Sequence, residues 1–165
     1  MKIFCFKRSD KPRTSSPYQL LYLMSDFDYK DFDTLMSADD VLNTLSGSCH
    51  DQVIFELDEL KKQGLNPRAK FLFAVDDNGD GGETHSFVYY SEDQTLFWFE
   101  NAWEDYRGIH PFDTEQEMLD FIIDAFINRN PGKMIYLADF NPEDHTTGED
   151  LQTLVDICMD NAIQV

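Results

Sequence analysis

The chain has few cysteines, few basic residues and no long apolar run, and each shortage argues against a class of protein. Its three cysteines, Cys5, Cys49 and Cys158, are an odd number without paired spacing, which disfavours a disulfide framework and a cysteine-rich zinc site. No stretch approaches the roughly 20 apolar residues that a membrane span needs. The N-terminal apolar segment is too short for a secretory signal and no small-residue cleavage site follows it. A cytoplasmic protein is therefore expected.

Positive charge is also scarce, because 13 Lys and Arg face 32 Asp and Glu and leave a net charge of −19. Such a field repels phosphate backbones and anionic lipid, so we expect neither a nucleic-acid nor a membrane partner. A basic partner or substrate is compatible with this charge. The simpler interpretation of an acidic surface is solubility.

What is present predicts a packed α+β protein. The 165 residues are 42% hydrophobic and 14% aromatic, enough for one domain over 1–165 with a proper core. Apolar periodicity, caps and turn residues predict helices early and late, with an antiparallel sheet between them. The segment 25–33 is acidic and aromatic and fits neither pattern. The expected helices are 18–24, 37–45, 49–63, 115–128 and 148–161, and the expected strands are 2–7, 71–75, 84–90, 95–102 and 133–140.

Cys49 is a candidate nucleophile because of its place in the chain. It follows the turn 46–48 and begins an apolar-periodic stretch, so it is expected in the first turn of a helix. A helix N-terminus lowers a thiol pKa, and the Cys49 backbone N–H could serve as an oxyanion donor. The alternative is a buried structural cysteine, which is the interpretation favoured for Cys5 and Cys158 within their apolar patterns.

His85, Glu100 and Asn101 complete the candidate site. His85 opens one predicted strand, and Glu100 and Asn101 close the next strand of an antiparallel meander. Alternation along a strand means that only one of Glu100 and Asn101 can face His85. A base held by a polar group beside a thiol is the arrangement that cysteine nucleophiles use. Each residue taken alone is more often structural.

Three segments, 47–52, 84–87 and 98–103, resemble the transglutaminase-like branch of the papain-like superfamily. Members carry a Gly-x-Cys-aromatic helix start, a strand with a histidine, and an acid followed at +3 by Trp or Pro. The resemblance covers about residues 38–112. It implies a Cys-bearing helix packed on an antiparallel sheet that carries the histidine and the acid.

The resemblance also implies roles for particular residues. Glu100 stands at the acid-x-x-Trp position, and a papain-like Asn-x-Trp pattern would select Asn101 instead. Asn43, six residues before Cys49, stands where papain-like enzymes place an oxyanion glutamine, and the alternative is a residue on the surface of its helix. His50 replaces the usual aromatic residue, and Glu replaces the usual Asp. The residues expected to line a substrate cleft are Trp98, Trp103 and Tyr106.

No cofactor or metal is expected. The loop from Asp76 to Asp80 has calcium-loop spacing, but Phe87 stands where an EF-hand has its bidentate glutamate, so a polar hairpin turn is the better interpretation. The histidines show no metal-ligand spacing.

Two functions remain open. The first is a cysteine-dependent amide or peptide hydrolase, or an acyl transferase, with a Cys49–His85–Glu100 triad and a peptide or protein amide substrate that could be basic. The second is a catalytically inactive module of the same fold that binds a basic protein partner. A metal-dependent hydrolase is a distant third.

Overall fold

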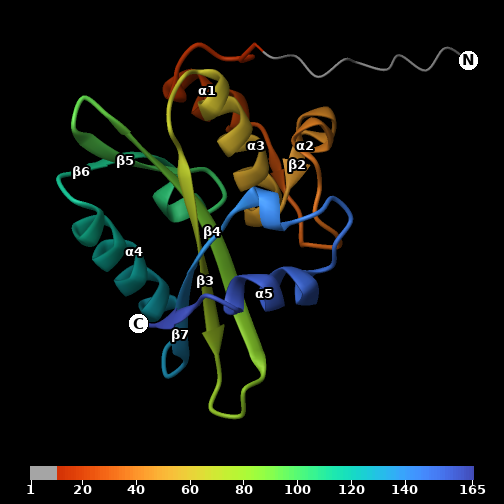
Figure 1. Cartoon of the computed structure of the whole chain (residues 1–165), viewed down its shortest axis with the longest axis vertical. Coiled ribbons are helices and arrows are strands. Elements are labelled where there is room, and N and C mark those ends of the chain that lie inside the picture. The colour runs from red at the N-terminus through yellow and green to blue at the C-terminus, as the bar shows by residue number, and fades with distance from the viewer. Residues whose placement is uncertain (1–10) are drawn as a thin grey trace, which may run out of the picture.

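The computed structural model describes residues 11–165 and is built around one antiparallel sheet (Figure 1). The six strands lie in the order β6-β5-β4-β3-β7-β8. Their bounds are β3 (Arg68–Val75), β4 (Gly81–Glu92), β5 (Thr95–Glu100), β6 (Gly108–Phe112), β7 (Met134–Asp139) and β8 (Ile163–Gln164). The fold class is α+β, as predicted. The strand expected at 2–7, with Cys5, falls outside the described residues.

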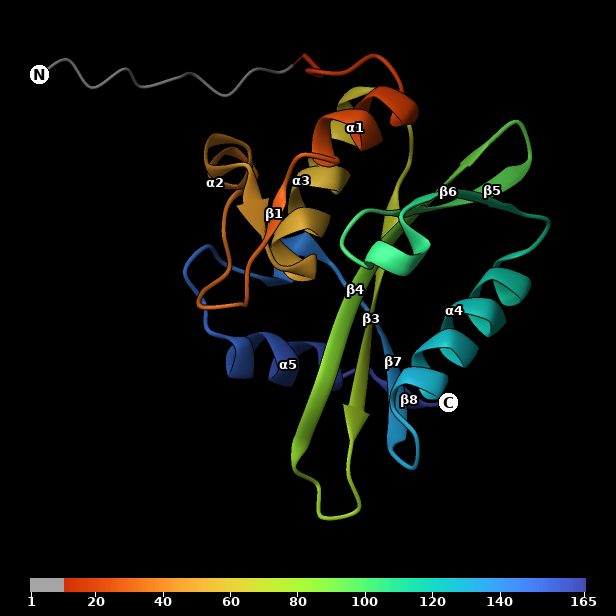
Figure 2. The ribbon, with the colours of Figure 1, turned by 180° about the vertical axis from the view of Figure 1, so that it is seen from behind.

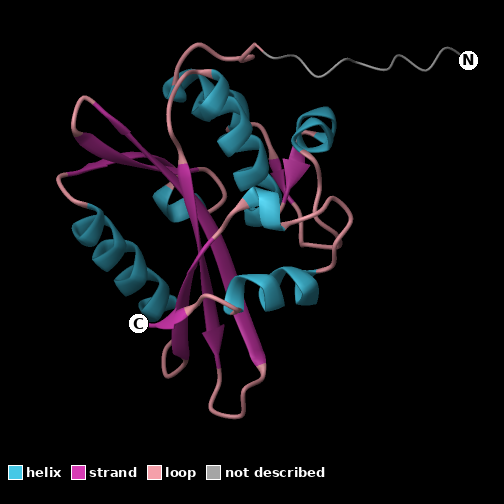
Figure 3. Cartoon of the chain, in the orientation of Figure 1, coloured by secondary structure: helices cyan, strands magenta, loops and turns pink. Residues whose placement is uncertain are grey.

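Residues 11–165 form five α-helices, which lie on both sides of the sheet (Figure 3). They are α1 (Pro17–Met24), α2 (Ala38–Thr44), α3 (Cys49–Lys62), α4 (Glu115–Arg129) and α5 (Leu151–Met159), with short 3-10 turns η1 (Glu104–Tyr106) and η2 (Pro142–Asp144). Helix α2 packs on α3. Side-chain oxygens of Ser16, Ser37, Ser48 and Thr114 cap the first four helices, and all but Ser48 are the caps that the sequence predicts. Within residues 11–165, no helix has the length and apolar character to cross a bilayer.

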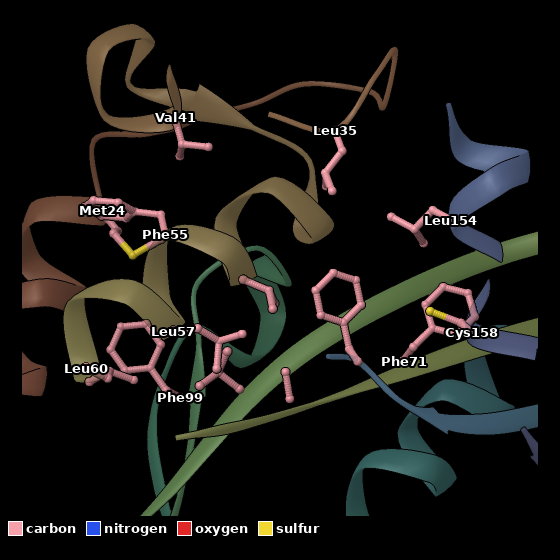
Figure 4. Packing of buried hydrophobic residues seen from close by; sticks show 14 of the residues in the cluster. Met24, Leu35, Val41, Phe55, Leu57, Leu60, Phe71, Phe99, Leu154 and Cys158 are labelled. Atoms are coloured by element: carbon pink, nitrogen blue, oxygen red, sulfur yellow. The ribbon is translucent and has the colours of Figure 1, made fainter. Parts of the chain in front are cut away.

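The sheet has a hydrophobic core on each face, because alternate residues of a strand point in opposite directions. On one face α1, α3 and α5 pack over a cluster that includes Phe55, Phe71 and Phe99 (Figure 4). On the other face α4 packs over a cluster that includes Leu72 and Trp98. Figure 2 shows α4 separated from α3 and α5 by the strands. Cys158 lies in the first core, as its apolar pattern predicts.

Several boundaries differ from the predictions for local reasons. β6 was not predicted, because Pro111 interrupts its pattern and the strand lies at the edge of the sheet, where proline is tolerated. α5 begins three residues later than expected, since Asp150 is the residue that caps it. Leu151, expected on the apolar face of this helix, is 36% exposed. The segment 25–33 contains a two-residue strand, β1 (Asp28–Tyr29), which pairs in parallel with β2 (Ser46–Gly47).

Candidate active site

The start of α3 is held by a reciprocal capping arrangement. The Ser48 hydroxyl accepts from the Asp51 N–H, and Asp51 Oδ2 accepts from the Ser48 N–H at 2.9 Å and from its hydroxyl at 2.8 Å. Asp51 Oδ1 accepts from the Met36 N–H at 2.8 Å. A Cβ at Gly47 would lie only 2.7 Å from the Asp51 Cβ, so this turn has no room for a larger residue. These bonds fix the backbone on both sides of Cys49.

His85 and Glu100 form a buried pair at adjacent strands. His85 Nε2 lies 2.9 Å from Glu100 Oε2, with His85 7% and Glu100 2% exposed. The other carboxylate oxygen, Oε1, accepts from the Trp103 backbone N–H at 2.8 Å. The turn after β5 therefore brings the N–H at +3 back to the carboxylate. This contact gives a physical reason for the acid-x-x-Trp spacing.

Cys49 lies at the N-terminus of α3, next to the strand that carries His85. Its Sγ is 4.0 Å from the carbonyl oxygen of Thr84, the residue before His85. β5 pairs with β4 only from Val88 to Glu92, so β5 does not cover the edge of β4 at His85. The helix thus places its first residue against that edge. The thiol is 2% exposed.

The electrostatics of the pair favour the charged forms of both groups. Burial alone would raise the pKa of the Cys49 thiol, but the charge and hydrogen bonding of His50 and then His85 outweigh it and lower this pKa well below its usual value. Burial would lower the pKa of His85, yet the Glu100 carboxylate, together with the Cys49 sulfur, raises it to about 10. An imidazolium that faces a thiolate is the state these shifts favour at neutral pH.

His50 occupies the position where the family pattern has an aromatic residue, and it packs like one. Its ring contacts Phe32 at 5.5 Å and Phe71 at 5.8 Å between centroids. Its nitrogens lie 2.7 Å from the Ser86 hydroxyl and 3.0 Å from the Thr84 hydroxyl. His85 has a carboxylate partner, whereas His50 has two hydroxyl partners. We therefore assign the positive charge beside the Cys49 sulfur to His85.

Two of the alternatives for the site do not hold in the structure. Asn101, the alternative third member, points away from His85 and donates to Gln52 Oε1 at 2.8 Å and to the Met24 carbonyl at 3.2 Å. The alternation of the strand explains this, since Glu100 takes the face of His85. Asn43, expected as an oxyanion donor, is exposed on α2, outside the buried cluster around Cys49.

The aromatic residues expected to line a cleft are mostly part of the core. Trp98 is fully buried in the α4-side cluster, so its expected contact with substrate is wrong. Trp103 is 7% exposed and its ring meets the His85 imidazole edge-on at 5.1 Å. Half-buried Tyr106 packs on Trp103 at 4.8 Å. The Trp103 ring therefore packs against the His85 imidazole, and the Tyr106 ring packs against Trp103.

The structure adds residues that the sequence patterns did not select. Gln52, one turn after Cys49, donates to the Gly47 carbonyl at 3.0 Å and so ties α3 to the turn before it. Glu56, one turn further along α3, is 3% exposed. Burial, and then the charge of Glu100, raises the pKa of Glu56 well above its usual value. Both could have been found from the helical spacing 49, 52, 56, which puts them on one face.

Comparisons with known proteins give a likeness of fold among the solved structures. No protein-family model matches the chain, and no curated protein matches it by sequence. Among solved structures, the fold is similar to that of Legionella pneumophila LapG (EGTA-treated), with 13% sequence identity and a TM-score of 0.44. The superposition covers 87% of this chain and 76% of that one.

A second group of a cysteine, a histidine and a glutamate lies at α5, with Cys158 in the same core cluster as Phe71. Cys158 Sγ is 3.8 Å from His145 Nε2, and His145 Nδ1 is 2.5 Å from Glu149 Oε1. Burial, followed by the charges of Glu149 and Asp144, raises the pKa of Cys158 to about 12. Cys158 also sits in the last turn of α5, where the helix dipole opposes a thiolate. Both effects favour the protonated thiol at Cys158.

The loop with calcium-like spacing is a hairpin turn. Asp76 Oδ1 accepts from the backbone N–H groups of Asn78 at 3.0 Å and Asp80 at 2.9 Å, which uses this carboxylate oxygen within the turn between β3 and β4. Gly79 supplies the positive φ of +79° that the turn needs. Over the described part of the chain, no three His, Cys, Asp or Glu side chains are grouped so as to hold a metal ion.

Proposed function

We propose that the chain is a cysteine-dependent hydrolase of amide or peptide bonds. The observation that carries the proposal is the buried His85–Glu100 pair, 2.9 Å apart, beside a helix-terminal thiol whose pKa is lowered. In this proposal Cys49 is the nucleophile, His85 is the acid and then the base, and Glu100 is the positioning residue that keeps His85 protonated and oriented.

The reaction would begin from the thiolate–imidazolium pair. The Cys49 thiolate attacks the carbonyl carbon, a C–S bond forms, and the π electrons move to the carbonyl oxygen near the Cys49 backbone N–H. The intermediate collapses as the C–N bond breaks, and His85 gives its proton to the leaving amine. His85, now neutral, takes a proton from water, whose oxygen attacks the thioester and releases the acid and the Cys49 thiolate.

Water is the expected acceptor of the acyl group, and an amine acceptor would make the same chemistry an acyl transfer. The side chains around the site do not select an amine over water. Product analysis with and without added glycine ethyl ester distinguishes the two outcomes, since transfer yields the amide of the added amine.

A basic segment next to the scissile amide is the substrate feature that the charges support. The exposed aspartates of the segment 26–33 lie beside the turn that precedes Cys49, because the Asp28 N–H donates to the Leu45 carbonyl at 2.9 Å and the Lys30 N–H to the Gly47 carbonyl at 3.3 Å. Lysine-containing fluorogenic peptides should be cleaved faster than glutamate-containing ones, with a difference that shrinks as salt rises. Equal cleavage rates for the two peptides would contradict a preference for basic substrates.

The deciding experiment is the pH dependence of Cys49 alkylation by iodoacetamide, read by peptide mass spectrometry. The proposal predicts a rate that stays high below about pH 7, and its loss in His85→Ala, because the imidazolium no longer stabilises the thiolate. His145→Ala is the matched control, since it removes the histidine of the Cys158 group and should leave the Cys49 profile unchanged.

A Cys49 that reacts only near the ordinary thiol pKa of about 8.5, equally in wild type and His85→Ala, would exclude the enzyme. The net charge of −19 then favours the second function, an inactive module that binds a basic protein. Pull-down with a poly-lysine resin at graded salt would be the next measurement for that function.

A further inference from the structure

The backbone places Tyr29 beside the nucleophile, although the two are far apart in the sequence. Tyr29 lies opposite Gly47 in the parallel β1–β2 pair, two residues before Cys49. The backbone on both sides of Tyr29 is tied to this turn, through the Asp28 N–H to Leu45 at 2.9 Å and the Lys30 N–H to Gly47 at 3.3 Å. The main chain at Tyr29 is therefore held, while the residue is 55% exposed.

The hydroxyl of Tyr29 reaches both polar groups of Cys49. Burial, and then the charge of the Cys49 sulfur, raises the pKa of Tyr29 above its usual value, whereas the Cys49 backbone N–H acts in the opposite direction, so the phenol lies within the influence of both groups. The phenol therefore remains protonated and able to donate. Its ring lies toward solvent, whereas the Cys49 thiol is 2% exposed.

This position is the one at which a substrate carbonyl oxygen would meet its donors. An oxyanion hole needs donors close to the oxygen that gains charge, and a backbone N–H of the nucleophile commonly supplies one of them. A second donor is required, and Asn43, which the sequence pattern suggested, is exposed on α2. The Tyr29 hydroxyl is the donor that the fold brings there instead.

We propose that Tyr29 is a catalytic residue that donates its phenol hydrogen to the substrate carbonyl oxygen, as the second donor of the oxyanion hole beside the Cys49 backbone N–H. This role rests on the function proposed above. In the free protein the hydroxyl lies beside the Cys49 thiolate. The incoming carbonyl oxygen displaces it from the backbone N–H.

In this proposal the Tyr29 O–H moves from the sulfur to the carbonyl oxygen as the negative charge is transferred between them. As the C–S bond forms, the negative charge leaves the sulfur and appears on the carbonyl oxygen, one bond further from Cys49. A rotation of the exposed Tyr29 side chain moves the O–H from the sulfur to that oxygen without breaking the β1–β2 pairing. When the C–N bond breaks and the C=O bond reforms, the O–H is released, so Tyr29 neither gains nor loses a proton overall.

Two reagents for the same thiol separate this role from the others. Alkylation by iodoacetamide proceeds by displacement at carbon and forms no oxyanion, whereas acylation by p-nitrophenyl acetate passes through a tetrahedral oxyanion. Both rates at Cys49 are measured at the plateau of the pH profile, for wild type, Tyr29→Phe and the control Tyr22→Phe, whose tyrosine is 82% exposed on α1.

Tyr29→Phe should slow acylation by about 10²-fold, the usual effect of removing one oxyanion donor, with alkylation close to wild type. Tyr22→Phe should change neither rate. Equal loss of both rates in Tyr29→Phe would mean a structural role, and faster acylation would mean that Tyr29 only blocks the thiol; either overturns the proposal. No acylation in a wild type that alkylates readily overturns it as well. A wild type that fails to alkylate at low pH refutes the proposed function, and with it this role.

Discussion

Glu100 uses its two carboxylate oxygens for two different contacts, and this division gives the residue its effect. Oε1 accepts from the Trp103 N–H at 2.8 Å, which holds the carboxylate in place, and Oε2 lies 2.9 Å from His85. The charge of the group therefore acts on a single imidazole at a fixed distance. Its loss should be seen first in the titration of His85.

Glu100→Gln should lower the pKa of His85 from about 10 by at least about one unit, since an opposite charge at this distance shifts a pKa by about 1–3 units. The imidazolium then loses its proton at lower pH, and the amide hydrolysis proposed above should decline earlier on the alkaline side. The measurement is an NMR titration of the His85 ring. Glu115→Gln, a half-buried acid that pairs with Arg68, is the control and should leave the His85 titration in place.

Glu56 should weaken the fold at neutral pH. Its pKa is raised in the folded state, so the free energy of unfolding is highest below the unfolded pKa of about 4.3 and decreases as the pH rises above it. Glu56→Gln removes this penalty. Urea unfolding should show the variant more stable than wild type at pH 7.5, with a smaller difference at pH 4. The same difference at both pH values would contradict a titrating Glu56.

At the scale of elements, the sequence predicted the helices better than the contacts between segments. Serine and threonine caps marked the starts of α1, α2 and α4 because capping is a local interaction between residues three apart. The pairing of β1 with β2 could not be predicted, since two-residue strands carry no periodicity and their register depends on where α1 and α3 pack. The sequence alone therefore did not predict that Tyr29 lies beside the turn that precedes Cys49.

The same distinction applies within the site. Strand alternation predicted that one of Glu100 and Asn101 would face His85, and the spacing to Trp103 favoured Glu100, which is the residue in contact. The fully buried position of Trp98 was not predicted. Burial of an aromatic residue on a strand depends on which helix covers that face, and α4 comes from a later part of the chain.

The capping turn before α3 should be intolerant of a side chain at position 47. A Cβ there would lie 2.7 Å from the Asp51 Cβ, and relief requires moving the carboxylate that holds the helix start. Gly47→Ala should therefore cost about 1–3 kcal/mol of unfolding free energy, as overpacked sites do, and should reduce the alkylation rate of Cys49.

Gly81→Ala provides the matched comparison for that variant. Its added Cβ would meet the Phe73 ring at 3.6 Å, an ordinary contact, so both stability and alkylation should stay near wild type. Urea denaturation and the iodoacetamide assay measure the two quantities. Equal effects of the two substitutions would show that the turn at Gly47 adapts.

At the scale of the whole molecule, the net charge of −19 sets the response to salt. Like charges distributed over the surface repel one another more strongly in the compact state than in the unfolded chain. Raising sodium chloride from about 0.05 to 0.5 M shortens the screening length to a few ångström and should raise the urea midpoint. Potassium chloride should have the same effect. A midpoint that falls with salt would mean that attractive ion pairs, such as Lys62–Asp58, outweigh the repulsion.

The two Cys–His–Glu groups of this protein have a consequence for how such sites are recognised. A search template built only on residue types and interatomic separations would retrieve the Cys158 group, where Glu149 lies 2.5 Å from His145, at least as readily as the Cys49 group. The two groups differ in where the thiol lies on its helix: Cys49 is the first residue of α3, and Cys158 lies in the last turn of α5. A template for cysteine nucleophiles should therefore encode the direction of the helix that bears the sulfur. Under the function proposed above, Cys49 would be a positive example for such a template and Cys158 a negative one.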